Sequence, residues 1–89
     1  MEDNQETLLE FPCEFPIKVM GKSDSGFEVD ALGFVRNHVP DFDTENMRSM
    51  PSKKGNYISV TFTIRATSKA QIDAIYMQLT ACEKILMAL

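Results

Sequence analysis

The stretch Tyr57-Ile58-Ser59-Val60-Thr61-Phe62-Thr63-Ile64-Arg65-Ala66 decides the fold of this 89-residue chain. Apolar and polar residues alternate along it, which is the period of a strand with one buried face and one polar face. Its β-branched residues also favour extended backbone. We therefore expect a strand whose polar side lies on an uncovered face of a sheet. Its expected core positions are Ile58, Val60, Phe62, Ile64 and Ala66.

Upstream of this stretch the sequence predicts one strand and one helix. Residues Phe15–Gly21 alternate in the same way and predict the first strand. Ser25 and Glu28 have the spacing of a capping box at the start of a helix over about residues 26–39. Gly33 lies inside that helix, where glycine costs about 1 kcal/mol relative to alanine. We therefore expect its missing side chain to permit close packing.

Three further elements complete the order. The segment 44–50 predicts a weak edge strand, followed by a loop over residues 51–56. A Ser-x-x-Gln capping box at Ser68 starts a helix over residues 69–81, in which apolar residues recur at helical spacing. The final segment 83–89 is apolar on both faces, which predicts a strand covered on both sides.

The order strand, helix, strand, strand, helix, strand is that of the ferredoxin-like α+β sandwich. This β-α-β-β-α-β fold has a four-stranded antiparallel sheet with two helices on one face. We expect one such domain over residues 11–89, because a chain of this length builds only one modest core. Residues 1–10 are expected to form an acidic, mobile tail.

The charge of the chain is divided unevenly. Its net charge is -4, yet residues 1–14 contain five acids and no base, so residues 15–89 carry +1. Within the tail, Leu8, Leu9 and Phe11 are expected to pack on the core, or alternatively to contact a partner. Removal of residues 1–6 is expected to leave the melting temperature nearly unchanged.

Composition also restricts location. No apolar run is long enough to cross a bilayer, so we expect no membrane association. The acidic N-terminus is unlike a signal peptide, and two cysteines are too few for a disulfide framework. We therefore expect a cytoplasmic protein.

Few residues offer catalytic or metal-binding chemistry. His38 is the single histidine, and Cys13 and Cys82 are far apart in sequence. Metal sites need clustered ligands and a thiol nucleophile needs a nearby base, so we expect no metal, no cofactor and no enzymatic activity. The near-neutral body lacks a basic face for phosphates, and Tyr57 is the one ring expected on the open sheet face. Nucleic acid is therefore excluded as the expected partner.

Two segments carry a resemblance to a known family. With Lys18-Val19-Met20-Gly21 and Gly55-Asn56-Tyr57-x-Ser59-Val60, the chain resembles the YbeD-like family of small bacterial cytoplasmic proteins over about residues 7–89. The resemblance implies the same fold, similar to ACT-type regulatory domains, and a conjectured regulatory role sometimes linked to lipoate metabolism. It implies no activity and no established site. Segment 43–50 matches the family poorly.

Five residues are candidate contacts for a partner or ligand: Lys18, Lys54, Tyr57, Ser59 and Arg65. All except Lys54 are expected on the open sheet face, whereas Lys54 belongs to a basic cluster with Arg48 and Lys53. These positions are open to three interpretations, namely a solvated face, a surface for a protein partner or a second copy, and a small-molecule contact.

We expect a non-enzymatic regulatory or protein-interaction module that acts through the open sheet face. The alternative is an ACT-type small-molecule sensor, linked to lipoate or amino-acid metabolism, with its ligand near residues 21–25 or on the open face.

Overall fold

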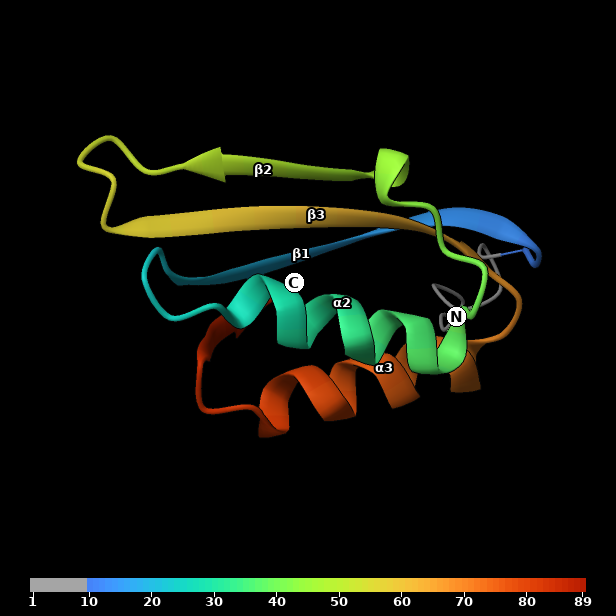
Figure 1. Ribbon diagram of the computed structural model, residues 1–89. Helices are drawn as coiled ribbons and strands as arrows, with labels where there is room; N and C mark the ends of the chain where they lie inside the picture. Colours follow the sequence, from blue (N-terminus) through green and yellow to red (C-terminus); the bar gives the residue numbers. More distant parts are fainter. Residues whose placement is uncertain (1–9) are drawn as a thin grey trace, which may run out of the picture.

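The computed structural model describes residues 10–89, which form a sheet layer and a helix layer (Figure 1). The elements in chain order are β1 (Cys13–Lys22), α2 (Phe27–His38), the 3₁₀ turn η1 (Thr44–Asn46), β2 (Met47–Pro51), β3 (Tyr57–Ala66), α3 (Lys69–Ala81) and β4 (Ile85–Ala88). Within this range the strands form one antiparallel sheet in the order β2-β3-β1-β4, and both helices cover one face of it. The predicted ferredoxin-like α+β fold is confirmed.

The sheet is built around the pairing of β1 with β3. Both strands have ten residues, and their register runs from Cys13 opposite Ala66 to Lys22 opposite Tyr57. The predicted first strand is therefore correct but two residues short at its start. Because neighbouring residues of a strand point to opposite faces, one register determines the composition of both faces of the sheet.

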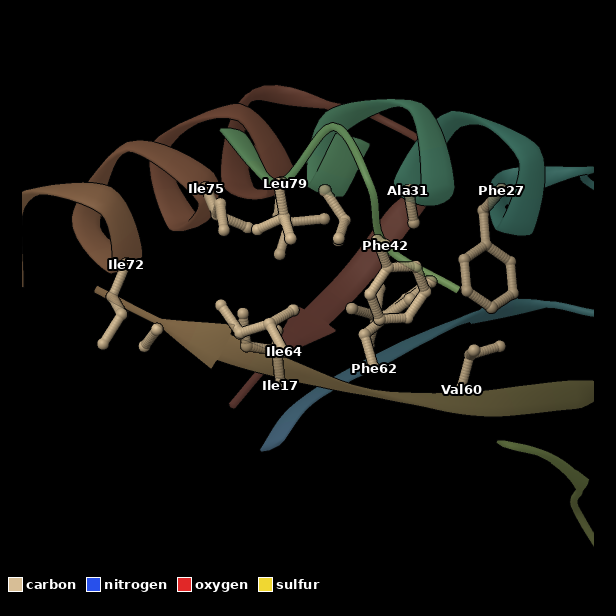
Figure 2. Packing of buried hydrophobic residues seen from close by; sticks show 14 residues of the cluster. Ile17, Phe27, Ala31, Phe42, Val60, Phe62, Ile64, Ile72, Ile75 and Leu79 are labelled. Atoms are coloured by element: carbon tan, nitrogen blue, oxygen red, sulfur yellow. The ribbon is translucent and has the colours of Figure 1, made fainter. Parts of the chain in front are cut away.

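The core lies between the sheet and the helices. Apolar side chains of α2 and α3 point toward the covered face of β1 and β3, as Figure 2 shows. The ring of Phe42, from the segment after α2, lies 5.9 Å from the ring of Phe62, centroid to centroid. The buried residues of the described chain are all apolar. They include Ile17, Val19, Phe27, Ala31, Val35, Val60, Phe62, Ile64, Ile72, Ile75 and Leu79.

The two helices begin differently. At α3 the Ser68 hydroxyl accepts a hydrogen bond from the Gln71 amide N–H at 3.1 Å, as the capping box predicts. At α2 the capping box of Ser25 and Glu28 is wrong, because Gly26 is the N-cap residue and the Ser25 hydroxyl accepts from the Phe27 N–H at 3.3 Å, not from that of Glu28. The left-handed backbone of Gly26, with φ of 74°, moves Ser25 one residue outside the cap position.

Close packing occurs at a different glycine from the one predicted. A Cβ on Gly33 would have no atom within 4 Å, so the expected packing role of Gly33 is wrong. A Cβ on Gly21 would lie 2.5 Å from Cδ1 of Phe27 and 2.9 Å from the backbone oxygen of Lys84. Gly21 therefore lets β1 pass directly under the first turn of α2.

The last strand, β4, is an edge strand. Within residues 10–89 it pairs with β1 alone, and Leu86 and Met87 are about half exposed, so the prediction that both of its faces are covered is wrong. The helices cover only one face of the sheet, and the apolar residues of β4 on the other face therefore meet solvent. The chain end is still held, because the Leu89 amide N–H donates to the Lys18 carbonyl at 2.7 Å and the Lys18 N–H donates back at 3.0 Å.

The other edge, β2, agrees only partly with its prediction. Met47–Pro51 is a strand, but the preceding residues Thr44–Asn46 form a 3₁₀ turn instead of the expected strand. The carboxylate of Asp43 accepts a hydrogen bond from the Glu45 N–H at 2.9 Å, which stabilises this turn.

The expectations for Leu8 and Leu9 lie outside the described residues. Phe11 is described, and it lies at the surface with 36% of its area exposed instead of in the core. In the part of the chain that the structure covers, no helix is long and apolar enough to span a bilayer.

Candidate functional site

The open face of the sheet carries a row of residues across all four strands, with a methionine on three of them and Ser59 on β3. Register places Met50 of β2 and Met20 of β1 on either side of Ser59 of β3, and Met87 of β4 next to Met20. Met50 and Met87 are 69% and 48% exposed. We call these residues, Met50, Ser59, Met20 and Met87, the methionine row.

A second row of different chemistry lies directly beside it. Arg48 of β2 is opposite Thr61 of β3, and Thr61 is opposite Lys18 of β1. Leu89 completes the row through its two hydrogen bonds with the Lys18 backbone. We call Arg48, Thr61, Lys18 and Leu89 the basic row. Because the two rows are two residues apart along each strand, they are separated by about 6.6 Å.

Shallow hollows follow these rows. A hollow of about 480 Å³ lies between the basic and methionine rows and is lined by Lys18, Arg48, Ser49, Met50, Ser59 and Thr61. A smaller hollow of about 190 Å³ extends from it toward Tyr57 and shares Met50 and Ser59 with it. The lining of both hollows is mainly apolar, and the larger one also contains the side chains of Lys18, Arg48, Ser59 and Thr61.

The cations of the basic row form no ion pair with an acid of residues 10–89. Within residues 10–89 the ion pairs are Lys69 with Asp73 and Lys84 with Asp30. The first lies within α3, and the second joins α2 to the residue before β4. Neither Lys18 nor Arg48 belongs to an ion pair or a side-chain hydrogen bond in this range, and the same holds for the hydroxyls of Ser59 and Thr61. The large hollow therefore presents donors that no group of the described chain satisfies.

A third hollow lies at the end of the sheet where two loops meet. It has a volume of about 330 Å³ and is lined by Lys22, Ser23, Asp24, Asn56 and Tyr57. The Ser23 N–H donates to the Asn56 carbonyl at 3.0 Å, and the Ser23 hydroxyl donates to the Gly55 carbonyl at 2.7 Å. These bonds hold the β1–α2 loop against the β2–β3 hairpin, where Gly55 has the positive φ of 77° that suits a glycine.

The structure brings together three of the five predicted contact residues. Lys18, Tyr57 and Ser59 lie on the open face along its two adjoining hollows and the loop hollow. Arg65 is on the same face but opposite Glu14, six residues from Ser59 along β3 and so about 20 Å away. Lys54 is in the exposed hairpin turn, outside the sheet.

The sequence patterns did not identify four residues of this site, which are Met20, Met50, Met87 and Arg48. Met20 could have been found, because its alternation with Val19 and Gly21 already places it on the open face. Arg48 and Met50 could not, because their facing depends on the register of β2, and no pattern in the sequence indicates that register. Met87 joins the row only through the pairing of β4 with β1.

The titratable groups of the helix layer are separate from this face. Nε2 of His38 lies 3.0 Å from Oε1 of Gln78, a hydrogen bond that connects α2 with α3. Burial raises the pKa of the Tyr76 phenol on α3 above its ordinary value of 10.0. Among residues 10–89 no three metal-ligating side chains gather at one point.

These features define a small α+β module with an uncovered sheet face that combines cations, hydroxyls and methionines. The sequence pattern of the family described as "Protein of unknown function (DUF493)" matches residues 6–89, and the chain belongs to this family. The resemblance to the YbeD-like family is thereby confirmed.

Relatives of known sequence are bacterial and nearly the same length. The chain is 47% identical over 75 residues to the UPF0250 protein NE1487 of Nitrosomonas europaea, covering 84% of this chain and 86% of that one. It is 40% identical over 84 residues to a UPF0250 protein of Neisseria gonorrhoeae, covering 94% and 92%.

A solved structure supports the fold. The solution structure of protein HP0495 from H. pylori superimposes with a TM-score of 0.69 at 12% identity, covering 98% of this chain and 91% of that one. At this identity the likeness concerns the fold alone.

Proposed function

We propose that this chain is a non-enzymatic regulatory module that acts by binding a partner protein through its open sheet face. The single observation that carries the proposal is the methionine row, which exposes large apolar side chains on a face that no described element covers. Exposed apolar patches of this kind commonly mark interaction sites. Methionine suits such a surface, because its flexible and polarisable side chain adapts to a partner's shape.

The construction of the sheet also supports the proposal. The core lies entirely on the other side of the sheet, and β1 and β3 pair over their whole length. The face is therefore a rigid platform, and its side chains can be changed with little effect on the core. The cytoplasm is the proposed location, where the free thiols of Cys13 and Cys82 would stay reduced.

The test compares two methionines of nearly equal exposure on opposite layers. Met50 on the open face is 69% exposed, and Met77 on α3 is 71% exposed. The full chain is used to capture a partner from a lysate of its own bacterium, and the purified partner is then titrated by calorimetry. Met50→Asp should weaken binding about tenfold, the effect of a well-placed contact residue, while Met77→Asp should change it less than about twofold.

Two results would contradict this proposal. One is a partner whose affinity falls equally with both substitutions, since the open face would then have no special role. The other is a chain that captures no partner and stays monomeric at all concentrations.

A second candidate function is favoured by the hollow between the two loops. It lies at the β1–α2 turn, where an ACT-type sensor is expected to hold its ligand, and it is lined by Lys22, Ser23 and Asp24. Thermal unfolding with amino acids, lipoate and related acids tests this function. A ligand present at about 100 times its Kd should add about 2.7 kcal/mol of stability. Unchanged melting at about 1 mM of each compound would argue against a sensor with micromolar affinity.

A further inference from the structure

We propose that the partner segment bound by the open face is an acidic peptide with large apolar side chains, placed with its carboxylates on the basic row and its apolar side chains on the methionine row. This inference rests on the proposed function and specifies the chemistry of the partner. It follows from the side-by-side arrangement of the two rows and their hollows.

The first argument is charge complementarity. Lys18 and Arg48 line the same hollow, and neither has an ion-pair partner within residues 10–89. The hydroxyls of Ser59 and Thr61 open into the same hollow with no hydrogen bond in that range. Two cations and two hydroxyls match a carboxylate, which accepts up to four hydrogen bonds and binds arginine through two of them.

The second argument is the distance between the rows. The smaller hollow is lined mainly by apolar groups and shares Met50 and Ser59 with the larger hollow, which also holds Lys18 and Arg48. The rows are about 6.6 Å apart, which is the separation of side chains i and i+2 in an extended segment and close to that of i and i+4 in a helix. A peptide with one acid and one apolar residue at such spacing can satisfy both hollows together.

The third argument concerns size. The patch measures about 14 Å across the four strands and about 13 Å along them, from Tyr57 to Thr61. A stable complex of two folded proteins buries about 800 Å² on each partner, which is several times this footprint. A short segment of chain fits the patch, whereas a second copy stacked face to face would also bring Lys18 and Arg48 of both copies together and repel.

The methionine row also distinguishes a peptide from other anions. A free phosphate or small carboxylate would use the basic row and leave Met20, Met50 and Met87 without a role. A nucleic acid would require rings for stacking, and Tyr57 is the one ring among the open-face residues of β1, β2 and β3. An acidic segment with apolar residues uses both rows.

The experiment is a titration of the full ¹⁵N-labelled chain, followed by amide shifts. Three blocked hexapeptides of serine are added separately, in which residues i and i+2 are replaced by Glu and Leu, by Lys and Leu, or by Glu alone; they are called the Glu/Leu, Lys/Leu and Glu/Ser peptides. The Glu/Leu peptide should give saturable shifts at Lys18, Met20, Ser59 and Thr61. The other two peptides should bind at least about tenfold more weakly, because each lacks one of the two contacts.

Two arginines on the same face provide the matched variants. Arg48→Glu should weaken binding of the Glu/Leu peptide about tenfold or more. Arg65 lies about 13 Å along β3 from Thr61 at the edge of the hollow, so Arg65→Glu should change binding less than about twofold. Arg48→Gln removes the charge without reversing it and should give an intermediate loss. It keeps the test valid if Arg48→Glu disturbs the fold, and the amide spectrum of each variant shows whether it is folded.

Several outcomes would overturn the inference. One is equal binding of the Lys/Leu or Glu/Ser peptide, and another is the appearance of the same shifts with inorganic phosphate alone. A third is an equal loss of affinity with Arg65→Glu. A fourth is the absence of saturable shifts at about 1 mM Glu/Leu peptide, because such an affinity is too weak for a specific site. The inference and the proposed function can fail independently. If Met50→Asp releases a captured partner while Arg48→Glu does not, the open face binds proteins and the proposed function holds, but the bound segment is not acidic and the inference is wrong.

Discussion

The two faces of the sheet consist of alternate residues of the same strands, yet they differ in almost every property. On the covered face Ile17, Val60 and Phe62 are completely buried beneath the helices (Figure 2). On the open face Met50 and Tyr57 are 69% and 41% exposed, and the cations Lys18 and Arg48 lie on the same face. Because the alternation keeps the two sets of side chains apart, the covered face can determine stability while the open face remains available for recognition.

The largest expected effect tests this division on neighbouring residues of β3. Ile64 is 1% exposed and Thr63 points to the open face. Ile64→Ala should lower the free energy of unfolding by about 2–5 kcal/mol, because it removes buried methyl groups and leaves a cavity. Thr63→Ala should lower it by less than about 1 kcal/mol, through strand propensity alone. Urea unfolding of both variants measures the difference, and equal losses would show that the open face also contributes to the core.

A smaller effect is expected where β1 contacts α2 on the covered side. In Gly21→Ala the new Cβ would overlap the Phe27 ring and the Lys84 carbonyl. We expect a loss of about 1–3 kcal/mol, the usual cost of adding a methyl group to a packed interior. Thermal unfolding checks this value. An unchanged melting temperature would mean that α2 can move away from the sheet without cost.

Gly33 in α2 should show the opposite change in stability from Gly21 in β1 when it is replaced by alanine. Its Cβ would meet no atom within 4 Å, and its backbone is helical. Gly33→Ala should therefore raise the free energy of unfolding by about 0.5–1 kcal/mol, because alanine is the better helix former. Calorimetry of the purified variant measures the gain. A lower stability of Gly33→Ala would contradict the prediction, because it would require an unfavourable contact of the new methyl group.

The smallest expected effect is a pH dependence within the helix layer. Burial raises the pKa of Tyr76 above 10.0, so the folded state favours the neutral phenol. Below pH about 10 the phenol is neutral in both states, and stability is lost as the pH rises through the raised pKa. Tyr76→Phe should reduce that alkaline loss without changing stability near neutral pH. Urea unfolding of both proteins at neutral and alkaline pH compares the slopes, and parallel slopes would contradict the prediction.

Local sequence patterns were sufficient for most of the fold. The alternation over residues 57–66 and the helical period over residues 69–81 each identify an element with its buried side. Such patterns succeed because burial acts on every second or every third to fourth residue, whatever the partner element is. The capping box at Ser68 succeeded for a similar reason, since its hydrogen bonds join residues within one turn.

The errors had two different causes. At the start of α2 the cause is local, because Gly26 is the N-cap and the Ser25 hydroxyl donates to the Lys22 carbonyl at 2.8 Å, an alternative within one turn. At β4 the cause is distant, because its place at the edge of the sheet depends on which strand it pairs with. That pairing has no local signal.

The sequence by itself determined that Lys18, Tyr57, Ser59 and Arg65 face away from the core, because side-chain alternation is a local property of a strand. Only the tertiary structure decided which open-face residues are neighbours. The antiparallel register joins Arg48 with Lys18 and Met50 with Met20, and it separates Arg65 from both pairs. The physical reason is that register arises from the packing of whole strands against a common core, and this packing depends on all elements at once.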